Sequence, residues 1–470
     1  MKILLINVCM RYDSPLKLPP VGLACIATAL NSAGFKPDIL DIDLHRYSDA
    51  EVIKYLESHP YDIIGLGNIV SGYKYTKRLS NIVKQVQPNT TLVVGNTVAS
   101  IPEQLLKWNP GIDIAVLGEG DVTIVEIVRT IAKSGSLADV DGIAFRNGDR
   151  VIRTKSRTPI SKMEDIPFPD FTPFEIDEYV KDSYKMIPEP HPIPVEELLA
   201  LPINTARGCP YNCSFCYHAF KDCPYRFYPF SLVLNEYKRL QDNYNIKYLN
   251  FWDELTLVSK KRAVELCNAI EKSNVEVYWP VNPMGNSFSS KDLDLLRRCK
   301  ELGAITIGGA LESSDPEILK AMNKKIKANA FVEQAHTARQ AGLIPGTSLV
   351  FGYPMETKDT IKNTLEVCRQ AGVYPSVGFV LPLPNTPIYQ YALDHDYITD
   401  EEEYLLRIAD RQDLHVNLTS LSDEELFDTV REELIKLKNY LGIPLFDKDV
   451  IKTTIYKAAR GQKGEVSEST

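Results

Sequence analysis

The chain has 470 residues, of which 44% are hydrophobic and 24% are charged, a composition typical of soluble globular proteins with two or three domains. Its formal net charge of -9 argues against a nucleic-acid-binding protein that relies on a broad basic surface. No apolar run approaches the roughly 18 residues of a membrane-spanning helix, and the short apolar opening soon meets charged residues and prolines, so we expect a cytoplasmic protein without a membrane partner.

Short apolar segments alternate with helical segments over residues 1–155, which predicts a doubly wound, Rossmann-like parallel sheet. The expected strands are Ile3–Val8, Asp38–Asp43, Ile63–Leu66, Leu92–Val94 and Ile112–Val116, and the expected helices are Gly22–Ala33, Asp49–Ser58 and Tyr73–Val86. Ligands of such sheets bind outside the carboxyl ends of the strands. The candidate binding loops are therefore Asn7–Pro20, Gly67–Ser71, Gly95–Ser100 and Gly118–Asp121.

A linker is expected over residues 156–199. It follows a hairpin over Arg146–Arg157, for which Asn147 and Gly148 form the expected turn. The linker contains two proline-dense segments, 165–170 and 188–194, which favour an extended chain that holds the flanking domains at a set distance.

The alternation of strands and helices resumes over residues 200–387, and about six strand–helix units predict a partial (β/α)6 barrel rather than a full eight-unit barrel. The first expected strand ends at Asn204–Ala206, and the others are Tyr248–Phe251, Tyr278–Val281, Ile305–Ala310, Gly346–Phe351 and Ser376–Val380. The expected helices are Ser231–Tyr244, Ser259–Lys272, Ser290–Leu302, Asp315–Met322, Ala328–Ala341 and Lys358–Ala371.

Residues 388–470 are expected to form a helical C-terminal region that caps the mouth of the barrel. An amphipathic helix is predicted over Asp423–Leu441, and the polar end from Gly461 is predicted to be disordered.

Three cysteines on one short loop carry the strongest chemical signal. Cys209, Cys213 and Cys216 have the spacing C-x3-C-x2-C, with Gly208 and Pro210 setting a tight loop around the first of them. Thiolates bind iron–sulfur clusters, and a cluster of four irons with only three cysteine ligands keeps one iron open for a small molecule. Zinc with His218 or Cys223 as a fourth ligand is the alternative, whereas the scattered remaining cysteines do not suggest a disulfide framework and are interpreted as buried small hydrophobic residues.

This loop, with its lead-in from Arg207 and an aromatic residue before the third cysteine, resembles the radical S-adenosylmethionine (SAM) enzymes. The resemblance implies a [4Fe-4S] cluster on the three cysteines, whose open iron chelates SAM and whose electron cleaves SAM to a 5′-deoxyadenosyl radical. It also implies an electron donor such as flavodoxin or ferredoxin, and a small-molecule substrate. By the same resemblance the candidate SAM contacts are Asp253, Glu254, Glu312 and Ser313, at the ends of the second and fourth barrel strands.

Helix capping is the alternative role for each of these acidic residues and for Glu356, which lies in a stretch similar to the family's Gly-x-Pro-Gly-Glu-Thr. Arg226 also has a counterpart in the family, and either an anionic partner or a salt bridge at a helix start would suit it.

The first domain resembles the cobalamin-binding domain that precedes the radical domain in one class of these enzymes. The resemblance rests on short stretches around Pro20, Gly95 and Gly118 that occur in the same order. It implies cobalamin contacts from Pro20, Gly22, Asn68, Ser71, Gly95, Asn96, Gly118, Glu119 and Gly120.

The chain departs from that class in two ways. Asn96 stands where a second glycine is usual, and the Asp-x-His-x-x-Gly motif of proteins that ligate cobalt through histidine is missing, since His45 only imitates its start. A retained fold without the cofactor is one alternative, and a dinucleotide site is another. The dinucleotide site is disfavoured because Val70 stands where the third glycine of the fingerprint would be.

The sequence therefore predicts a cobalamin-dependent radical SAM enzyme. Methyl transfer to an unactivated carbon or phosphorus centre is the leading hypothesis. A cyclisation or rearrangement without methyl transfer, and a non-catalytic iron–sulfur or cobalamin-binding protein, are the alternatives. No motif identifies the catalytic residues, the substrate or the oligomeric state.

Overall fold

The structure is a computed structural model that describes residues 1–452 with six exceptions, which are Asp13, Pro15, Pro188, Pro190, Ala219 and Asp222. The end that we predict to be disordered, from Gly461 onward, lies outside the described residues. Within them, no helix is both long and apolar enough to cross a membrane.

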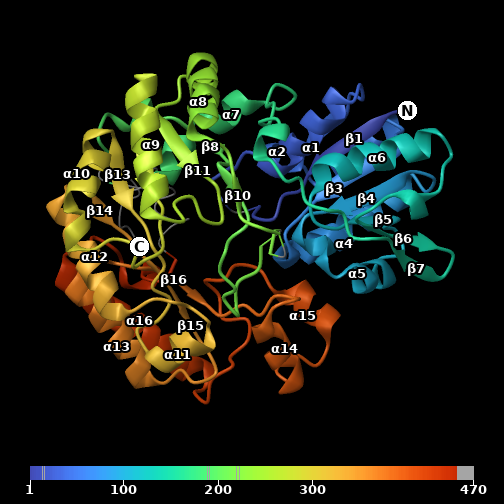
Figure 1. The fold of residues 1–470 in the computed structure, drawn as a ribbon. Helices are drawn as coiled ribbons and strands as arrows, with labels where there is room; N and C mark the ends of the chain where they lie inside the picture. The colour runs from blue at the N-terminus through green and yellow to red at the C-terminus, as the bar shows by residue number, and fades with distance from the viewer. Residues whose placement is uncertain are drawn as a thin grey trace, which may run out of the picture.

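The first part of the chain forms a seven-stranded sheet in the order β2-β1-β3-β4-β5-β6-β7, with the first five strands parallel. Its strands are β1 (Ile3–Asn7), β2 (Asp38–Asp41), β3 (Ile63–Gly67), β4 (Thr91–Gly95), β5 (Ile114–Val116), β6 (Ile143–Asn147) and β7 (Arg150–Arg153). The helices are α1 (Val21–Ser32), α2 (Ile42–His45), α3 (Asp49–Ser58), α4 (Tyr73–Val86), α5 (Pro102–Trp108) and α6 (Gly120–Ala132). This Rossmann-like sheet, on the right in Figure 1, confirms the predicted fold of the domain.

Three local expectations differ from the structure. The second strand ends at Asp41 because the carboxylate of Asp41 accepts a hydrogen bond from Leu44 N at 2.9 Å and starts α2. The hairpin of β6 and β7 starts earlier than expected. Asn147 pairs with Arg150, so the turn is formed by Gly148 and Asp149 and not by Asn147 and Gly148. Gly148 has a φ of 61°, which a glycine adopts without strain.

The second part of the chain forms an open arc of parallel strands, β8 (Ala200–Ile203), β11 (Tyr248–Phe251), β12 (Trp279–Val281), β13 (Ala304–Ile307), β15 (Ser348–Phe351) and β16 (Ser376–Phe379). Parallel bridges between Tyr248 and Tyr278 and between Glu312 and Leu349 connect the pairs, and β14 (Ile344–Pro345) pairs with β13. The covering helices are α8 (Phe230–Tyr244), α9 (Lys260–Ser273), α10 (Leu293–Glu301), α11 (Pro316–Ala321), α12 (Ala328–Gln340) and α13 (Lys358–Ala371). The predicted partial barrel is thus present, on the left in Figure 1.

The first barrel strand ends at Ile203 and not at Ala206 as expected. The amide groups of Thr205 and Ala206 donate to Asp253 Oδ1 at 2.7 and 3.1 Å, so they bond to a side chain instead of a neighbouring strand. The chain then forms β9 (Ala206–Arg207), which pairs antiparallel with β10 (Arg226–Phe227). These two short strands are the base from which the cysteine loop projects.

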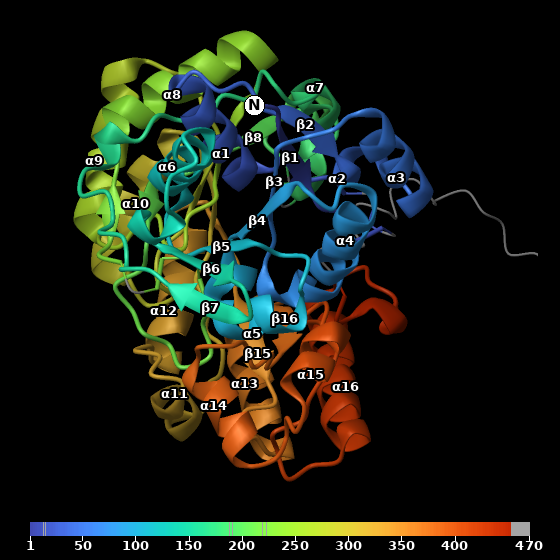
Figure 2. The same cartoon turned by 90° about the vertical axis from the view of Figure 1, so that its right-hand side faces the viewer.

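The C-terminal helices are α14 (Pro387–Asp394), α15 (Glu401–Arg407) and α16 (Asp423–Leu441), drawn in orange to red in Figure 2. The expectation that this region caps the barrel mouth is wrong for α16, because its buried face, which includes Leu426 and Val430, shares an apolar core with α13. Glu402 on α15 instead contacts the first domain, where Tyr73 Oη donates to its carboxylate at 2.6 Å.

One apolar core runs across both domains. It includes Ile3 and Ile124 of the first domain, Phe171 and Tyr179 of the linker, and Phe230 of the barrel. The linker residue Tyr179 also donates a hydrogen bond of 2.6 Å to Asp41 Oδ2. The linker is therefore packed against both domains, and the division of the chain at residues 155, 199 and 387 stays a prediction.

Candidate functional site

A cavity of about 490 Å³ lies between the two domains, at the carboxyl ends of the parallel strands. This is the edge of a doubly wound sheet where ligands bind. The first domain contributes glycines and apolar side chains, the linker contributes Phe168, and the barrel side contributes Tyr228 and Trp252. Phe220 of the cysteine loop also lines the cavity, so the space reaches from the first sheet to that loop.

Most of the predicted cobalamin contacts lie at this cavity. The lining includes Pro20, Gly22, Asn68, Gly95, Asn96, Gly118, Glu119 and Gly120, whereas Ser71 does not line it. A Cβ atom added at Gly22 or Gly118 would meet no protein atom within 4 Å, so the backbone there faces open space. A broad apolar wall with exposed backbone fits a flat macrocycle such as a corrin, and the residues present therefore fit the group that the sequence implies.

Two asparagines at the cavity direct their side chains into the protein. Asn68 Nδ2 donates to Gly72 O at 3.0 Å, and Asn96 Oδ1 accepts from Thr97 N at 2.6 Å. Asn96 has φ 65° and ψ -165°, a conformation that is almost restricted to glycine. The asparagine thus keeps the backbone shape of the glycine that it replaces.

His45 lies outside this site. Its Nε2 atom is 2.7 Å from Glu175 Oε1, and it does not line the cavity. The structure therefore agrees with its interpretation as a surface residue.

The three cysteines of the candidate cluster site lie on the loop between β9 and β10. Among the described residues, no three His, Cys, Asp or Glu side chains converge as a metal-binding group. The case for a cluster at this loop therefore rests on the chemistry of the three thiols. Burial, together with the neighbouring Cys213 and Cys209, raises the pKa of the Cys216 thiol to about 11. Burial also raises the pKa of Cys209 and Cys213. Three soft thiols that lose their protons when a metal binds are a fitting set for iron.

The two acidic residues after β11 have different positions. Asp253 accepts hydrogen bonds from Thr205 and Ala206, so its carboxylate holds the start of the cysteine loop. The side chain of Glu254 lies with Oε1 3.9 Å from His218 Nδ1 on the cysteine loop, and burial raises its pKa. Glu254 is therefore better placed than Asp253 for direct contact with a ligand at the cluster.

Glu312 is held in an unusual conformation beside the cysteines. It has a φ of 64°, which costs a non-glycine residue about 1–2 kcal/mol, and its Oε1 pairs with Lys324 Nζ at 3.1 Å. Burial lowers the pKa of Lys324, but the Glu312 carboxylate, Cys213 and Cys216 together outweigh burial and raise that pKa. Ser313 is buried, and its hydroxyl accepts from Asp315 N at 3.2 Å.

Sequence reasoning missed Lys324, because it is one of three lysines within four residues, a pattern that suggests a solvated helix end. The structure buries its side chain at 8% exposure, where its charge also acts on Cys213 and Cys216. A fixed cation at this place can hold a carboxylate or offset the negative charge of thiolates.

Glu356 has a buried carboxyl group whose raised pKa makes the stability of the protein depend on pH. It is 1% exposed, and Thr360 Oγ1 on the first turn of α13 donates to it. The capping alternative is wrong for this residue, because the N-cap of α13 is Thr357 and Glu356 precedes the helix. Burial raises its pKa to about 7 from an ordinary 4.5. The folded state therefore holds its proton longer than the unfolded state does, so the stability present below about pH 4.5 is lost as the pH rises towards 7.

We expect Glu356→Gln, which is neutral at every pH, to gain stability relative to the parent as the pH rises. The gain between pH 5 and pH 8 should be about 2 kcal/mol, since one pKa unit corresponds to about 1.4 kcal/mol. Urea unfolding of both proteins at the two pH values measures it. A stability difference that does not change with pH would contradict the raised pKa.

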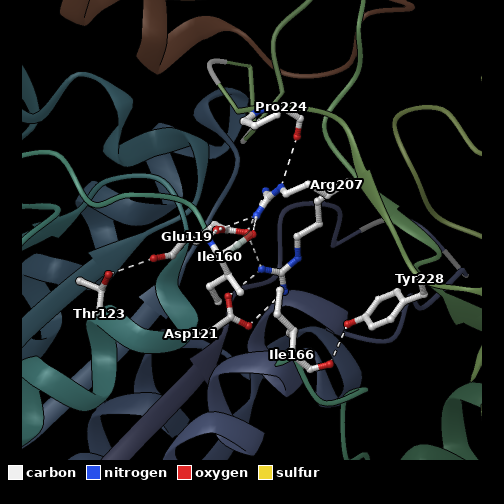
Figure 3. A network of polar contacts seen from close by, with 9 residues as sticks. Glu119, Asp121, Thr123, Ile160, Ile166, Arg207, Pro224 and Tyr228 are labelled. Atoms are coloured by element: carbon white, nitrogen blue, oxygen red, sulfur yellow. Dashed lines mark hydrogen bonds and ion pairs between the residues drawn. The ribbon is translucent and has the colours of Figure 1, made fainter. Parts of the chain in front are cut away.

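A buried ion network joins the two domains beside the cavity (Figure 3). Glu119 Oε1 lies 2.9 Å from Arg207 Nη1 and 3.0 Å from Arg226 Nη2, and Asp121 forms a second, bidentate pair with Arg207 at 2.9 and 3.0 Å. Glu119 Oε2 accepts from Ile160 N of the linker at 2.8 Å. The network gives Arg226 an anionic partner and directs the Glu119 carboxylate to the arginines. Only the backbone around Glu119 is then left to contact a ligand.

Two family models match the chain, the radical SAM superfamily over residues 203–368 and the B12 binding domain over residues 9–128. An uncharacterized methyltransferase of Pyrococcus horikoshii is 26% identical over 81% of this chain and 80% of its own length. The anaerobic magnesium-protoporphyrin IX monomethyl ester cyclase of Rubrivivax gelatinosus is 25% identical over 82% of this chain and 68% of its own length.

The fold also has a counterpart among solved structures. The radical SAM methyltransferase TsrM of Kitasatospora setae, solved with cobalamin and a [4Fe-4S] cluster bound, has a TM-score of 0.64 and 17% identity, over 84% of this chain and 75% of that chain. The likeness shows that the two chains share the fold over the aligned part.

Proposed function

Because this chain is a radical SAM enzyme with an N-terminal B12-binding domain, and thus a member of the cobalamin-dependent radical SAM family, we propose that it is a methyltransferase that acts on an unactivated carbon or phosphorus centre of a small molecule. A [4Fe-4S] cluster, SAM and cobalamin are the cofactors of this family. The observation that supports the proposal most is the single cavity, which joins the glycine-lined edge of the first sheet to Phe220 of the cysteine loop.

The cofactors, when bound, supply an electron, a 5′-deoxyadenosyl radical and a methyl group. The residues of this chain hold and orient them. We assign Cys209, Cys213 and Cys216 as the cluster ligands, and Glu254, Glu312 and Ser313 as the groups around SAM. Asp253 is assigned a positioning role, since it fixes the start of the loop. Phe168, Tyr228 and Trp252 form an apolar wall that keeps water away from a reactive centre.

Both methyltransferases and cyclases occur among the relatives, so the products of SAM decide between the two reactions. We expect the anaerobically reconstituted protein, given SAM, cobalamin and a reductant, to form both 5′-deoxyadenosine and S-adenosylhomocysteine. Omitting cobalamin should remove the second product and leave the first. Chromatography of the quenched mixture measures both.

Each other outcome has a distinct meaning. 5′-Deoxyadenosine alone, with cobalamin bound, would overturn methyl transfer and favour a cyclisation or rearrangement. Neither product, from protein that holds its full iron, would favour a non-catalytic cofactor-binding protein.

The reaction also requires an electron donor, for which we propose flavodoxin or ferredoxin. We propose the cytoplasm as its site of action. The structure describes all nine cysteines and joins none of them in a disulfide, which is consistent with a reducing compartment.

A further inference from the structure

The cysteine loop is closed at its base by two arginines that face each other. Arg207 and Arg226 are directly paired across the antiparallel strands β9 and β10, and the loop with the three cysteines runs between them. Like charges at paired positions repel one another and destabilise the pairing. The side chains of both arginines are also largely buried, at 10% and 7% exposure, so water does not screen the repulsion.

The carboxylate that offsets this repulsion belongs to the other domain. Glu119 reaches both arginines, and its own side chain is only 3% exposed. Of the two arginines, Asp121 contacts only Arg207. Among the described contacts, Glu119 is therefore the carboxylate that bridges both arginines. The geometry of the cysteine loop therefore depends on a residue of the B12-binding domain.

Glu119 stands between two glycines whose backbone lines the cavity. Gly118 has a φ of 72°, and a Cβ added at Gly120 would lie 2.7 Å from Ile26 Cδ1, so neither position accepts a side chain without strain or displacement. A ligand seated on this backbone would restrict the segment that carries the Glu119 carboxylate. Through the contacts of Glu119 with the two arginines, that restriction would reach the base of the cysteine loop.

We propose that Glu119 is a positioning residue that couples the two cofactor sites, so that cobalamin in the cavity stabilises the iron–sulfur loop and the cluster in turn tightens the binding of cobalamin. The inference rests on the proposed use of both cofactors. Coupling between two sites is reciprocal, and typical values change affinity by about 5- to 150-fold.

The test measures the coupling itself in the full-length holoenzyme. Iron release into a chelator is followed with and without hydroxocobalamin, and hydroxocobalamin affinity is measured with and without the cluster. In the parent protein, cobalamin should slow iron release, and the cluster should raise the cobalamin affinity on the order of tenfold. In Glu119→Gln, which removes the charge but keeps the size, both ratios should fall to about one.

Glu402→Gln is the matched control. Glu402 also joins the two parts of the chain, through Tyr73 and Lys77 on α4, but it contacts neither arginine. This variant should keep the coupling of the parent. If it loses the coupling as Glu119→Gln does, general domain docking explains the effect and the specific role of Glu119 is overturned.

The remaining outcomes are also decisive. Slow iron release that persists in Glu119→Gln would mean that cobalamin only shields the cluster, and would overturn the proposal. If circular dichroism shows that Glu119→Gln does not fold, Arg226→Lys takes its place, because lysine keeps the charge but cannot bridge as a fork. A coupling in Arg226→Lys equal to that of the parent would then overturn the proposal. If the parent protein binds cobalamin but neither cofactor changes the retention of the other, only the coupling is overturned. If the parent protein binds no cobalamin, the proposed function is overturned as well.

Discussion

Replacing Cys213 by alanine will leave the protein without a stable [4Fe-4S] cluster and will lower SAM cleavage by more than about 100-fold. Loss of an outer-shell partner of a metal site already costs about 10- to 100-fold, and a direct ligand contributes more. Cys213 lies between the other two cysteines in the motif, so its removal leaves only two thiolates for the cluster. Iron and sulfide analysis after anaerobic reconstitution, with the ultraviolet–visible spectrum, measures the loss.

Cys223→Ala is the matched control for this experiment. Cys223 lies on the same loop, and its amide donates to Phe220 O at 3.0 Å, but it is outside the motif. It should keep its iron and its SAM cleavage. A Cys223 variant that loses iron, beside a Cys213 variant that keeps it, would show that the ligand set is wrong.

The second large effect is expected at Gly22, near the start of α1. Gly22→Phe should weaken cobalamin binding by about 10- to 100-fold, the equivalent of the ~1–3 kcal/mol that overpacking costs. A Cβ at this position meets no protein atom within 4 Å, so the ring would enter the cavity without displacing the fold. Titration with hydroxocobalamin, followed by absorbance, measures the affinity.

Gly22→Ala provides the graded comparison, because its single methyl group should reduce the affinity only slightly. Both variants should keep the iron content of the parent, since Gly22 belongs to α1 of the first domain and the three cysteines lie on the loop between β9 and β10. Unchanged cobalamin affinity in Gly22→Phe would place the corrin elsewhere.

Four helices could be predicted to the residue, and three of them carry strong local signals at their ends, whereas α4 has no side-chain cap. The bounds of α3, α4, α13 and α16 are those expected. Ser48 and Ser422 form capping boxes at the starts of two of them, and Gly442 ends α16 in the left-handed conformation. Such ends depend on neighbours within four residues, which a sequence displays directly.

The short helix α5 and the longer α6 were not foreseen. The first two residues of α6 belong to the segment Gly118–Asp121, which we expected to be a loop throughout. Two features hid the helix: a glycine at its first position, and an N-cap residue, Glu119, whose side chain makes no capping bond. Glu119 bonds instead to arginines 88 and 107 residues away.

Contacts between residues far apart in sequence also limit how much of the site could be predicted. The cysteine spacing predicts the cluster loop by itself, because the three candidate ligands lie within eight residues. The roles of Asp253 and Lys324 depend on contacts with Thr205 and Glu312 that only the fold creates. The candidate cobalamin loops, by contrast, could be named from the sequence, because parallel strands place their carboxyl ends at one edge.

The apolar core that includes Ile3, Phe171 and Phe230 has a consequence for how the protein melts and how it can be divided. Dividing the chain in the linker would expose the apolar residues of this core to water on both fragments, which favours aggregation. We therefore expect the two domains to unfold together in one cooperative transition. Neither domain could be replaced by that of a homologue unless the core residues of the other domain that contact it were replaced as well.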